Sequence, residues 1–405
     1  MRSIYKRRRF NKKRASALLI VVILWATCLT AWMYFNSARP SNLVTPTIAP
    51  KTVQPRSVSS NVLFLGNTFW GRYVEDWSMA SPLKYSYPFS RLNEFQRDKY
   101  DAWISGIECP IVASVHMTSA EQEQALQFNC SPNFLPEASK WFTAFTLANN
   151  HTDNQGSEGF TETKQQLEKN GIQYFGHYDP RVIDDVCEVV SLPATVTKDN
   201  GKLSKGNIPV AMCAYHGVFQ IPPEESAAII KKYSDYMPVI AMPHMGAEYQ
   251  AAPDEIKTTF YRSLIDNGAD MVIGDHPHWV QTSESYKGHL IVYSMGNFMF
   301  DQQGIMEMTR SAGINVVMSI NDKPGVLSKW LALGGSCGRF KDDCLDKIKA
   351  QNLPKLHVIY RFGFVGTNDD KKIAKPATAE QQAGISQRLN WQSTMQGLQS
   401  PYGSL

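Results

Sequence analysis

Short apolar runs recur along the chain from residue 61 onward, and most of them have the length of a β-strand. We expect strands at 61–66, 102–108, 142–148, 208–215, 238–243, 270–274, 289–296, 313–320 and 356–362. The apolar residues in these runs are continuous rather than alternating with polar ones. Continuous runs are typical of strands that are covered on both faces by other elements.

Two segments between the runs carry helix signals instead. Residues 253–268 place an apolar stripe of Ile256, Phe260 and Leu264 between an opening proline and a closing Asn–Gly pair. Residues 157–171 end with the same pair. Buried strands that alternate with amphipathic helices predict an α/β fold.

The N-terminal segment differs from the rest of the chain. Residues 1–16 hold eight Lys or Arg and no acid, and residues 17–35 hold no charge. An uncharged, mostly apolar stretch of about 20 residues can cross a bilayer as a helix. We therefore expect 17–35 to be an uncleaved signal anchor, with residues 1–16 in the cytoplasm and the remainder outside. The alternative is a cleaved signal peptide, whose apolar region is usually shorter.

Residues 36–60 contain four prolines and many Ser and Thr residues, with little that a core could bury. This composition is typical of a spacer between a membrane and a folded domain. Residues 61–405 are expected to form that domain. Beyond residue 16 the chain holds 33 Lys or Arg and 37 Asp or Glu, so no basic surface for nucleic acid is expected.

The cysteines suit a domain outside the cytoplasm. Cys28 lies in the apolar segment, and the other six form an even set. Cys337 and Cys344 close a small polar loop and are the first candidates for a disulfide. The pairs 109–130 and 187–213 are further candidates, although six cysteines permit 15 pairings and some could be small buried hydrophobes.

Polar side chains gather where the apolar runs stop. Ligands of open α/β sheets bind just beyond the carboxyl ends of the strands, so these side chains are expected to meet at one rim. The residues concerned are Asn67, Arg72, Glu108, Asn149, Asn150, His151, His244, Glu248, His276, His278 and Asn297.

The segment GDHPHWV places His276 and His278 on either side of Pro277. Proline disfavours the helical region for the residue before it, which indicates an extended segment. In an extended backbone residues i and i+2 point to the same side, so the two imidazoles are expected side by side. Imidazole is a common metal ligand, and with Glu108 and His244 the pair predicts a metal site. The alternative is that both histidines are ordinary residues satisfied by hydrogen bonds.

Longer segments occur in a fixed order: LGNTFWGR, GIECPI, LANNHTDNQGSEGF, MPHMGAEY, NGADMVIGDHPHWVQTSESYKGHLIVYSMGNFMFD and the closing KPATAEQQAGISQRL…SPYGSL. Together they resemble the capsule-biosynthesis (CapA-type) family, which is associated with poly-gamma-glutamate and belongs to the calcineurin-like metallophosphoesterase superfamily. The resemblance covers about residues 61–301 and the tail. It implies two packed mixed β-sheets flanked by helices, a four-layer αββα arrangement, with a metal site on the loops.

The resemblance also implies a role for each matching residue. Two divalent cations of Mn, Zn, Fe or Mg would clamp a phosphoryl or acyl oxygen of the substrate. The residues that would hold them are Glu108 as the bridge, Asn150, His244 and His276 for one ion, and Asn67 and His278 for the other. His151 would act as an acid toward the leaving group, and Arg72 would hold an anionic group.

The chain departs from the family pattern at three positions. Asn67 and Asn154 stand where the family usually has Asp, and Gly106 stands where it usually has Asn. An amide oxygen can ligate a cation but adds no negative charge. We therefore expect an asymmetric site, in which one cation is held firmly and the cation at Asn67 and His278 is weak or absent.

Plainer interpretations of single residues stand beside these roles. Arg72 is otherwise a salt-bridged surface arginine, and Glu248 could equally be a surface carboxylate. Asn149 is expected to brace its turn, and His216 is expected to be an ordinary histidine.

Together these features predict a protein of the bacterial cytoplasmic membrane that acts outside the cell membrane in capsule or envelope synthesis. Its substrate would be an anionic polymer or peptide, and its reaction metal-assisted hydrolysis or transfer. A second interpretation is a non-catalytic subunit that guides polymer export with membrane synthase subunits. A third is a metal-independent enzyme in which His278 and Glu108 act as acid and base. No nucleic-acid partner is expected.

Overall fold

The computed structural model describes residues 24–33, 53–337, 341–369 and 372–398. Residues 24–33 are helical, and the rest of the predicted membrane segment lies outside the described residues, as do residues 1–16 and most of the predicted spacer. Among the described residues, no helix combines the length and the apolar character that a membrane span requires. A separate compact unit begins at Val53.

All nine predicted apolar runs overlap a strand of this unit, and further short strands complete the sheet. The strands are β1 (Pro55–Thr68), β2 (Ala102–Ile107), β3 (Ala144–Thr146), β4 (Gln173–Phe175), β5 (Cys187–Lys198), β6 (Leu203–Gly217), β7 (Val239–Met245), β8 (Met271–Ile273), β9 (Ser283–Tyr286), β10 (His289–Val292), β11 (Asn297–Met299), β12 (Arg310–Ile320), β13 (Val358–Asn368) and β14 (Lys375–Pro376). They form one mixed sheet in the order β14-β13-β12-β1-β5-β6-β7-β8-β10-β9, with β2, β3, β4 and β11 branching from β1.

The strand β1 joins the two parts of this sheet. Its residues 55–59 pair antiparallel with β5, and residues 58–64 pair antiparallel with β12. Its residues 62–68 pair parallel with β2. The implied pair of separate packed sheets is therefore replaced by one hydrogen-bonded sheet, because a strand of 14 residues is long enough for its two halves to take different neighbours. The strand also begins at Pro55, inside the segment whose composition indicated a spacer.

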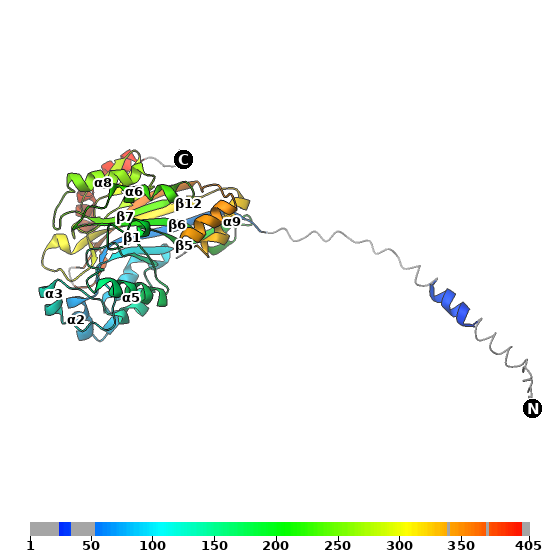
Figure 1. Cartoon of the computed structure of the whole chain (residues 1–405), viewed down its shortest axis with the longest axis horizontal. Helices are drawn as coiled ribbons and strands as arrows, with labels where there is room; N and C mark the ends of the chain where they lie inside the picture. Colours follow the sequence, from blue (N-terminus) through cyan, green and yellow to red (C-terminus); the bar gives the residue numbers. More distant parts are fainter. Residues whose placement is uncertain (1–23, 34–52, 338–340, 370–371, 399–405) are drawn as a thin grey trace, which may run out of the picture. The chain divides into compact units, whose positions relative to one another are not determined.

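Helices lie on both sides of the strands, which agrees with the α/β prediction. The helices are α2 (Arg72–Ala80), α3 (Ser119–Ala125), α4 (Leu135–Ala138), α5 (Gly156–Lys169), α6 (Glu224–Ala228), α7 (Lys231–Ser234), α8 (Glu255–Asp266), α9 (Pro324–Gly334), α10 (Lys341–Ala350), α11 (Ala379–Arg388) and α12 (Trp391–Gly397). In Figure 1, α6 and α8 lie on one side of β1, β6 and β7, and α2, α3 and α5 lie on the other. The two predicted helices are α5 and α8.

The helix α8 differs from its prediction in two details. It begins after Asp254, whose side chain accepts a hydrogen bond from the backbone N–H of Lys257 and caps the helix. Ile256, expected on the buried stripe, is 54% exposed, whereas Lys257 is 1% exposed. The helix is therefore rotated about its axis, so that Lys257 points into the protein while Phe260 and Leu264 remain buried.

Two apolar clusters fill the space between the strands and the helices. Val62 and Phe64 of β1 belong to one cluster, and Leu63 and Leu65 belong to the other. Alternate residues of a strand point to opposite faces, so β1 is covered on both sides, as its continuous apolar run predicted.

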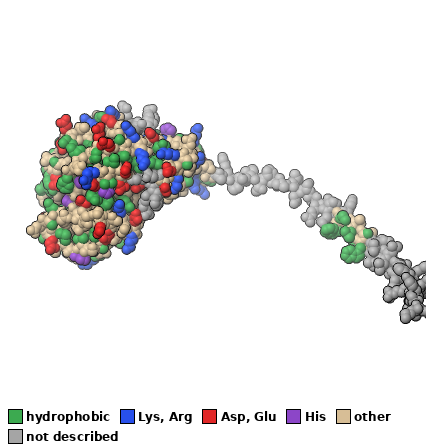
Figure 2. Space-filling view, viewed as in Figure 1, with side chains coloured by type: hydrophobic (Ala, Val, Ile, Leu, Met, Phe, Trp, Pro, Cys, Tyr) green, Lys and Arg blue, Asp and Glu red, His purple; other side chains and the backbone are tan. Residues whose placement is uncertain are grey.

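All three candidate disulfides are present, joining Cys109 to Cys130, Cys187 to Cys213 and Cys337 to Cys344. Acidic and basic side chains are interspersed over the described part of the face in Figure 2, and no continuous basic patch is visible there. This distribution agrees with the charge balance of the sequence beyond residue 16.

Candidate functional site

The carboxyl ends of several strands open into one cavity of about 530 Å³. Glu108 follows β2, Asn150 and His151 follow β3, and His276 and His278 follow β8. All five residues line the cavity. The meeting of strand ends at one rim, which the sequence predicted, is therefore observed.

The other predicted residues lie at or behind the same wall. Arg72 lines the cavity directly, and His244 and Asn67 are buried in contact with residues that line it. Every residue to which the sequence assigned a site role is thus brought to this cavity or to the layer behind it.

His244 lies at the centre of a tight polar cluster. Its Nε2 atom is 2.9 Å from Oδ1 of Asn150, 3.1 Å from Nδ1 of His276 and 3.8 Å from Oε1 of Glu108. Oε1 of Glu108 is buried and has no hydrogen-bond partner. Nε2 of a neutral imidazole carries at most one proton, which cannot satisfy all three neighbours. Electron-rich atoms at such separations resemble the ligands around one cation.

Asn149 and His216 lie beside His244. Nδ2 of Asn149 lies 3.1 Å from Nε2 of His244, while its Oδ1 accepts a hydrogen bond from the backbone N–H of His151. Asn149 therefore braces the turn, as expected. His216 pairs in register with His244 across β6 and β7, and its Nε2 is buried without a partner. No local signal in the sequence marked His216, because its neighbour lies on another strand.

Burial dominates the electrostatics of this cluster. Burial raises the pKa of Glu108 well above its ordinary value, and the nearby Asp275 and Glu248 raise it further. Burial lowers the pKa of His244 and His276 well below the ordinary value of histidine. The histidines are therefore neutral, and a cation would offset the cost of the buried carboxylate charge. These residues fit a divalent cation.

The fit depends on an amide ligand. Among the described residues, no three His, Cys, Asp or Glu side chains form a metal-holding group by themselves. A cation beside His244 would therefore also need Oδ1 of Asn150, which lies within the cluster. Amide oxygens are ordinary ligands of hard cations such as Mg²⁺.

His278 belongs to a second polar cluster. Its Nδ1 lies 2.8 Å from Oδ1 of Asn297 and 3.2 Å from Nδ2 of Asn67. Nδ2 of Asn297 donates to Oε1 of Gln302, so Oδ1 of Asn297 is directed at His278 and accepts its Nδ1 proton. Burial lowers the pKa of His278 to about 4, so the ring is neutral and Nε2 keeps its lone pair. Asn67 lies against His278, as expected, but contributes no charge.

Asn154 determines which ring nitrogen of His151 carries the proton. Its Nδ1 lies 3.0 Å from Oδ1 of Asn154, and that oxygen also accepts the backbone N–H of Phe128. Nδ1 therefore carries the proton and Nε2 the lone pair. Burial lowers the pKa of His151 to about 4. The neutral ring can accept a proton at Nε2. To act as an acid toward the leaving group, His151 would first have to be protonated at Nε2.

Arg72 is already paired. Its Nε and Nη2 atoms donate to the two carboxylate oxygens of Asp301, at 2.8 and 2.6 Å. The guanidinium also lies 4.2 Å from the ring centre of Phe128. The salt bridge that was the plainer interpretation of Arg72 is thus present, although within the cavity wall rather than on the surface. An anion could use only the guanidinium N–H groups that Asp301 leaves free.

The HPH segment is not extended as predicted. The backbone φ angles of His276 and His278 are 96° and 61°, in the left-handed region that residues other than glycine rarely adopt. The two ring centres lie 6.1 Å apart, and both rings reach the cavity. The segment bends at residues 277–279. Positive φ angles of this kind are concentrated at functional sites.

The cavity wall contains residues that the sequence did not single out. Tyr249 stacks on His278 with ring centres 5.5 Å apart, and its hydroxyl accepts a hydrogen bond from Gln302. Phe219 and Leu126 line the cavity and are largely exposed. Only Tyr249 had a sequence signal, since it follows Glu248 in MPHMGAEY.

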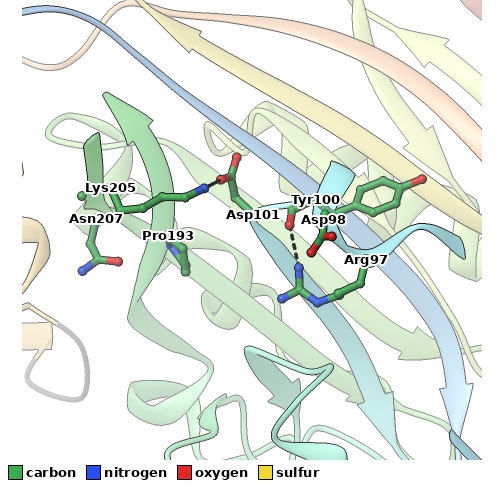
Figure 3. Close-up of a pocket in the computed structure, with 8 residues that line it drawn as sticks. Arg97, Asp98, Tyr100, Asp101, Pro193, Lys205 and Asn207 are labelled. Carbon is green, nitrogen blue, oxygen red and sulfur yellow. Dashed lines mark hydrogen bonds and ion pairs between the residues drawn. The ribbon is translucent and has the colours of Figure 1, made fainter. Parts of the chain in front are cut away.

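A second cavity, of about 430 Å³, lies at the amino end of β2 and includes Asp101 (Figure 3). Lys205 contacts Asp101 at 2.9 Å, and Nη1 of Arg97 donates to the backbone carbonyl of Tyr100. These cations already have partners within the cavity, and no histidine lines it. The cavity at the carboxyl ends of the strands is the better candidate for a functional site.

Comparisons with known proteins identify the family of this chain. Residues 61–302 match the family described as bacterial capsule synthesis protein PGA_cap. The PGA biosynthesis protein CapA of Bacillus subtilis (strain 168) is 29% identical over 311 residues, which cover 73% of this chain and 74% of that protein. The capsule biosynthesis protein CapA of Bacillus anthracis is 24% identical over 59% of each chain.

More distant matches cover less of the chain. A probable polyglutamine synthesis accessory protein of Mycobacterium tuberculosis is 28% identical over 39% of this chain and 45% of that protein. The crystal structure of a hypothetical protein from Thermus thermophilus overlaps 65% of this chain and 94% of that chain, with 15% identity and a TM-score of 0.34, too low to support an inference. The family match covers more than half of this sequence, and it includes the predicted ligands from Asn67 to His278. The chain therefore belongs to the bacterial capsule synthesis protein PGA_cap family.

Proposed function

We propose that this chain is a membrane-anchored protein of capsule or exopolymer synthesis whose domain outside the membrane acts on an anionic polymer of the poly-gamma-glutamate type. The names of the Bacillus relatives, which refer to PGA and capsule biosynthesis, support the polymer. The uncharged residues 17–35, preceded by the basic residues 1–16, support an anchor in the bacterial cytoplasmic membrane.

The observation that carries the proposal is the cluster around His244. Three polar atoms from Glu108, Asn150 and His276 approach its Nε2 within 3.8 Å, and one of them is a buried carboxylate oxygen without a partner. A bound ion is one explanation for a buried polar atom that has no partner. We infer one firmly bound divalent cation, of Mn, Zn, Fe or Mg, in this cluster.

The chemistry that fits is hydrolysis or transfer at a phosphoester or amide. A divalent cation bound there would polarise a phosphoryl or acyl oxygen of the substrate. His151 lines the cavity with an unprotonated Nε2, which suits it to take a proton from an attacking water. The free N–H groups of Arg72 would orient a carboxylate or phosphate of the polymer.

Two other functions have an observation in their favour. The neutral amides of Asn67 and Asn154 would suit a non-catalytic subunit that guides polymer export with membrane synthase subunits. The raised pKa of Glu108 would suit a metal-independent enzyme in which Glu108 and His278 exchange protons with the substrate.

The test is metal content and activity of the full-length protein. We expect about one tightly bound cation for each chain, with hydrolysis of a phosphodiester or gamma-glutamyl substrate that a chelator abolishes. His244→Ala should remove both, whereas Glu158→Gln, at an exposed position on α5, should change neither. A protein without metal and activity that captures synthase subunits would favour the export subunit. Activity that survives the chelator would favour the metal-independent enzyme.

A further inference from the structure

Glu248 faces His278 across a short gap. Oε1 of Glu248 lies 3.8 Å from Nε2 of His278, which is too far for a hydrogen bond. Because Nδ1 of His278 is directed at Oδ1 of Asn297, Nε2 carries a lone pair rather than a proton. Two electron-rich atoms therefore face each other. Nitrogen and oxygen ligands that each lie about 2 Å from one cation are separated by about 3–4 Å.

Contacts of the neighbouring residue Tyr249 fix the loop that carries Glu248. The backbone N–H of Tyr249 donates to the carbonyl of Pro277 at 2.9 Å, which ties the loop after β7 to the loop that carries His278. The ring of Tyr249 stacks on the imidazole of His278 with an angle of 20° between the planes. Glu248 therefore lines the cavity while remaining an exposed carboxylate. Its side chain is 40% exposed, which leaves it room to close the gap.

Within the described part of the chain, Glu248 is the carboxylate that makes an ion-pair contact with His278. The other polar contacts of His278 are the amides of Asn297 and Asn67, which carry no charge. The neighbouring cluster holds Glu108, whose Oε1 is buried and unpartnered in the same cavity wall. A cation at Nε2 of His278 would need a negative ligand of its own, and Glu248 is in position to supply it.

We propose that Glu248 supplies the anionic ligand of a second, weaker cation site formed with Nε2 of His278. The inference rests on the proposed function, since it takes the cavity to be a cation site. It changes the expected asymmetry of that site: the charge that an amide at position 67 cannot provide comes from the loop after β7 instead.

The test titrates Mn²⁺ into the metal-free, full-length protein and counts bound ions by equilibrium dialysis. The wild type should bind one ion tightly and a second more weakly. Glu248→Gln should weaken the second ion by at least about tenfold and leave the first unchanged, since loss of a ligating carboxylate removes its charge. Glu255→Gln, at an exposed position on α8, is the matched control.

The outcomes separate this inference from the proposed function. Two ions that Glu248→Gln leaves unchanged, or one ion only in the wild type, would overturn the role of Glu248 and leave the tight site intact. A wild type that binds no Mn²⁺ would overturn both. Thermal unfolding of each metal-free variant checks that the substitutions leave the fold intact, and loss of the tight ion in Glu248→Gln would also count against the inference.

Discussion

The side-chain oxygen of Asn154 lies 3.0 Å from Nδ1 of His151. It accepts the ring proton on Nδ1 and so leaves Nε2 unprotonated. The oxygen is identified by its second contact, since it accepts the backbone N–H of Phe128 at 2.9 Å. Phe128 in turn lies against His151, with ring centres 4.1 Å apart. Burial of the ring lowers the pKa of His151, and the hydrogen bond to Asn154 offsets part of that change.

Asn154→Asp should raise the pKa of His151 from about 4, because a carboxylate would replace the amide and stabilise the protonated ring. An adjacent carboxylate typically changes a pKa by about 1–3 units. A pH titration of the His151 ring signals by NMR measures the change. Asn133→Asp, at an exposed position, should leave these signals unaffected. An unchanged titration in Asn154→Asp would contradict the hydrogen bond that the structure shows.

Glu108→Gln should act in opposite directions with and without a cation. In metal-free protein the pKa of Glu108 is raised, so its contribution to stability is present below the unfolded pKa and is lost as pH rises toward the folded value. The variant should therefore unfold at a higher temperature than the wild type above neutral pH, by about 2–4 °C for each kcal/mol. Added Mn²⁺ should stabilise the wild type and not the variant. A variant that is less stable in both conditions would indicate a structural carboxylate instead.

Lys257 should make the stability of the protein rise with pH above neutrality. Burial lowers its pKa to about 7, and its Nζ donates to Oε1 of Gln281 at 3.0 Å. Between this value and the higher pKa of the unfolded chain, the unfolded state binds more protons, so the free energy of unfolding increases by up to about 1.4 kcal/mol for each pH unit. Lys257→Met should flatten this rise in urea unfolding between pH 7 and pH 9. Lys202→Met, on the exposed end of a hairpin, should keep it.

The disulfide between Cys109 and Cys130 should be the one that matters to the cavity. It joins the residue after Glu108 to the loop that carries Phe128, which packs on Arg72 and His151. Cys109→Ser with Cys130→Ser should destabilise the protein by about 3 kcal/mol, since the bridge closes a loop of more than 20 residues. It should also weaken the protection of the Phe128 amide against hydrogen exchange. Removal of Cys337–Cys344, with a separation of 7, should cost less and leave Phe128 protected.

The rim of the cavity could be predicted because it depends on local pattern alone. Glu108, Asn150 and His276 each follow an apolar run that forms a strand, and neighbouring parallel strands end at one edge. The same logic located His244 near the end of β7. The partners of these residues could not be read in this way. Asp301 pairs with Arg72 across 229 positions of sequence, and no local signal marks such a contact.

The sequence by itself determined the α/β class, the positions of α5 and α8 and the polar residues at the strand ends that meet at the cavity, because these follow from apolar periodicity and from where each strand stops. Only the tertiary structure decided three further things. It turned Lys257 inward and Ile256 outward, since a helical stripe does not specify the rotation of a helix against its sheet. It placed His276 and His278 at positive φ, a backbone conformation that residues other than glycine rarely adopt and that local sequence does not indicate. It set Asn154 against His151, because hydrogen bonding in the folded cavity decides where a histidine proton resides.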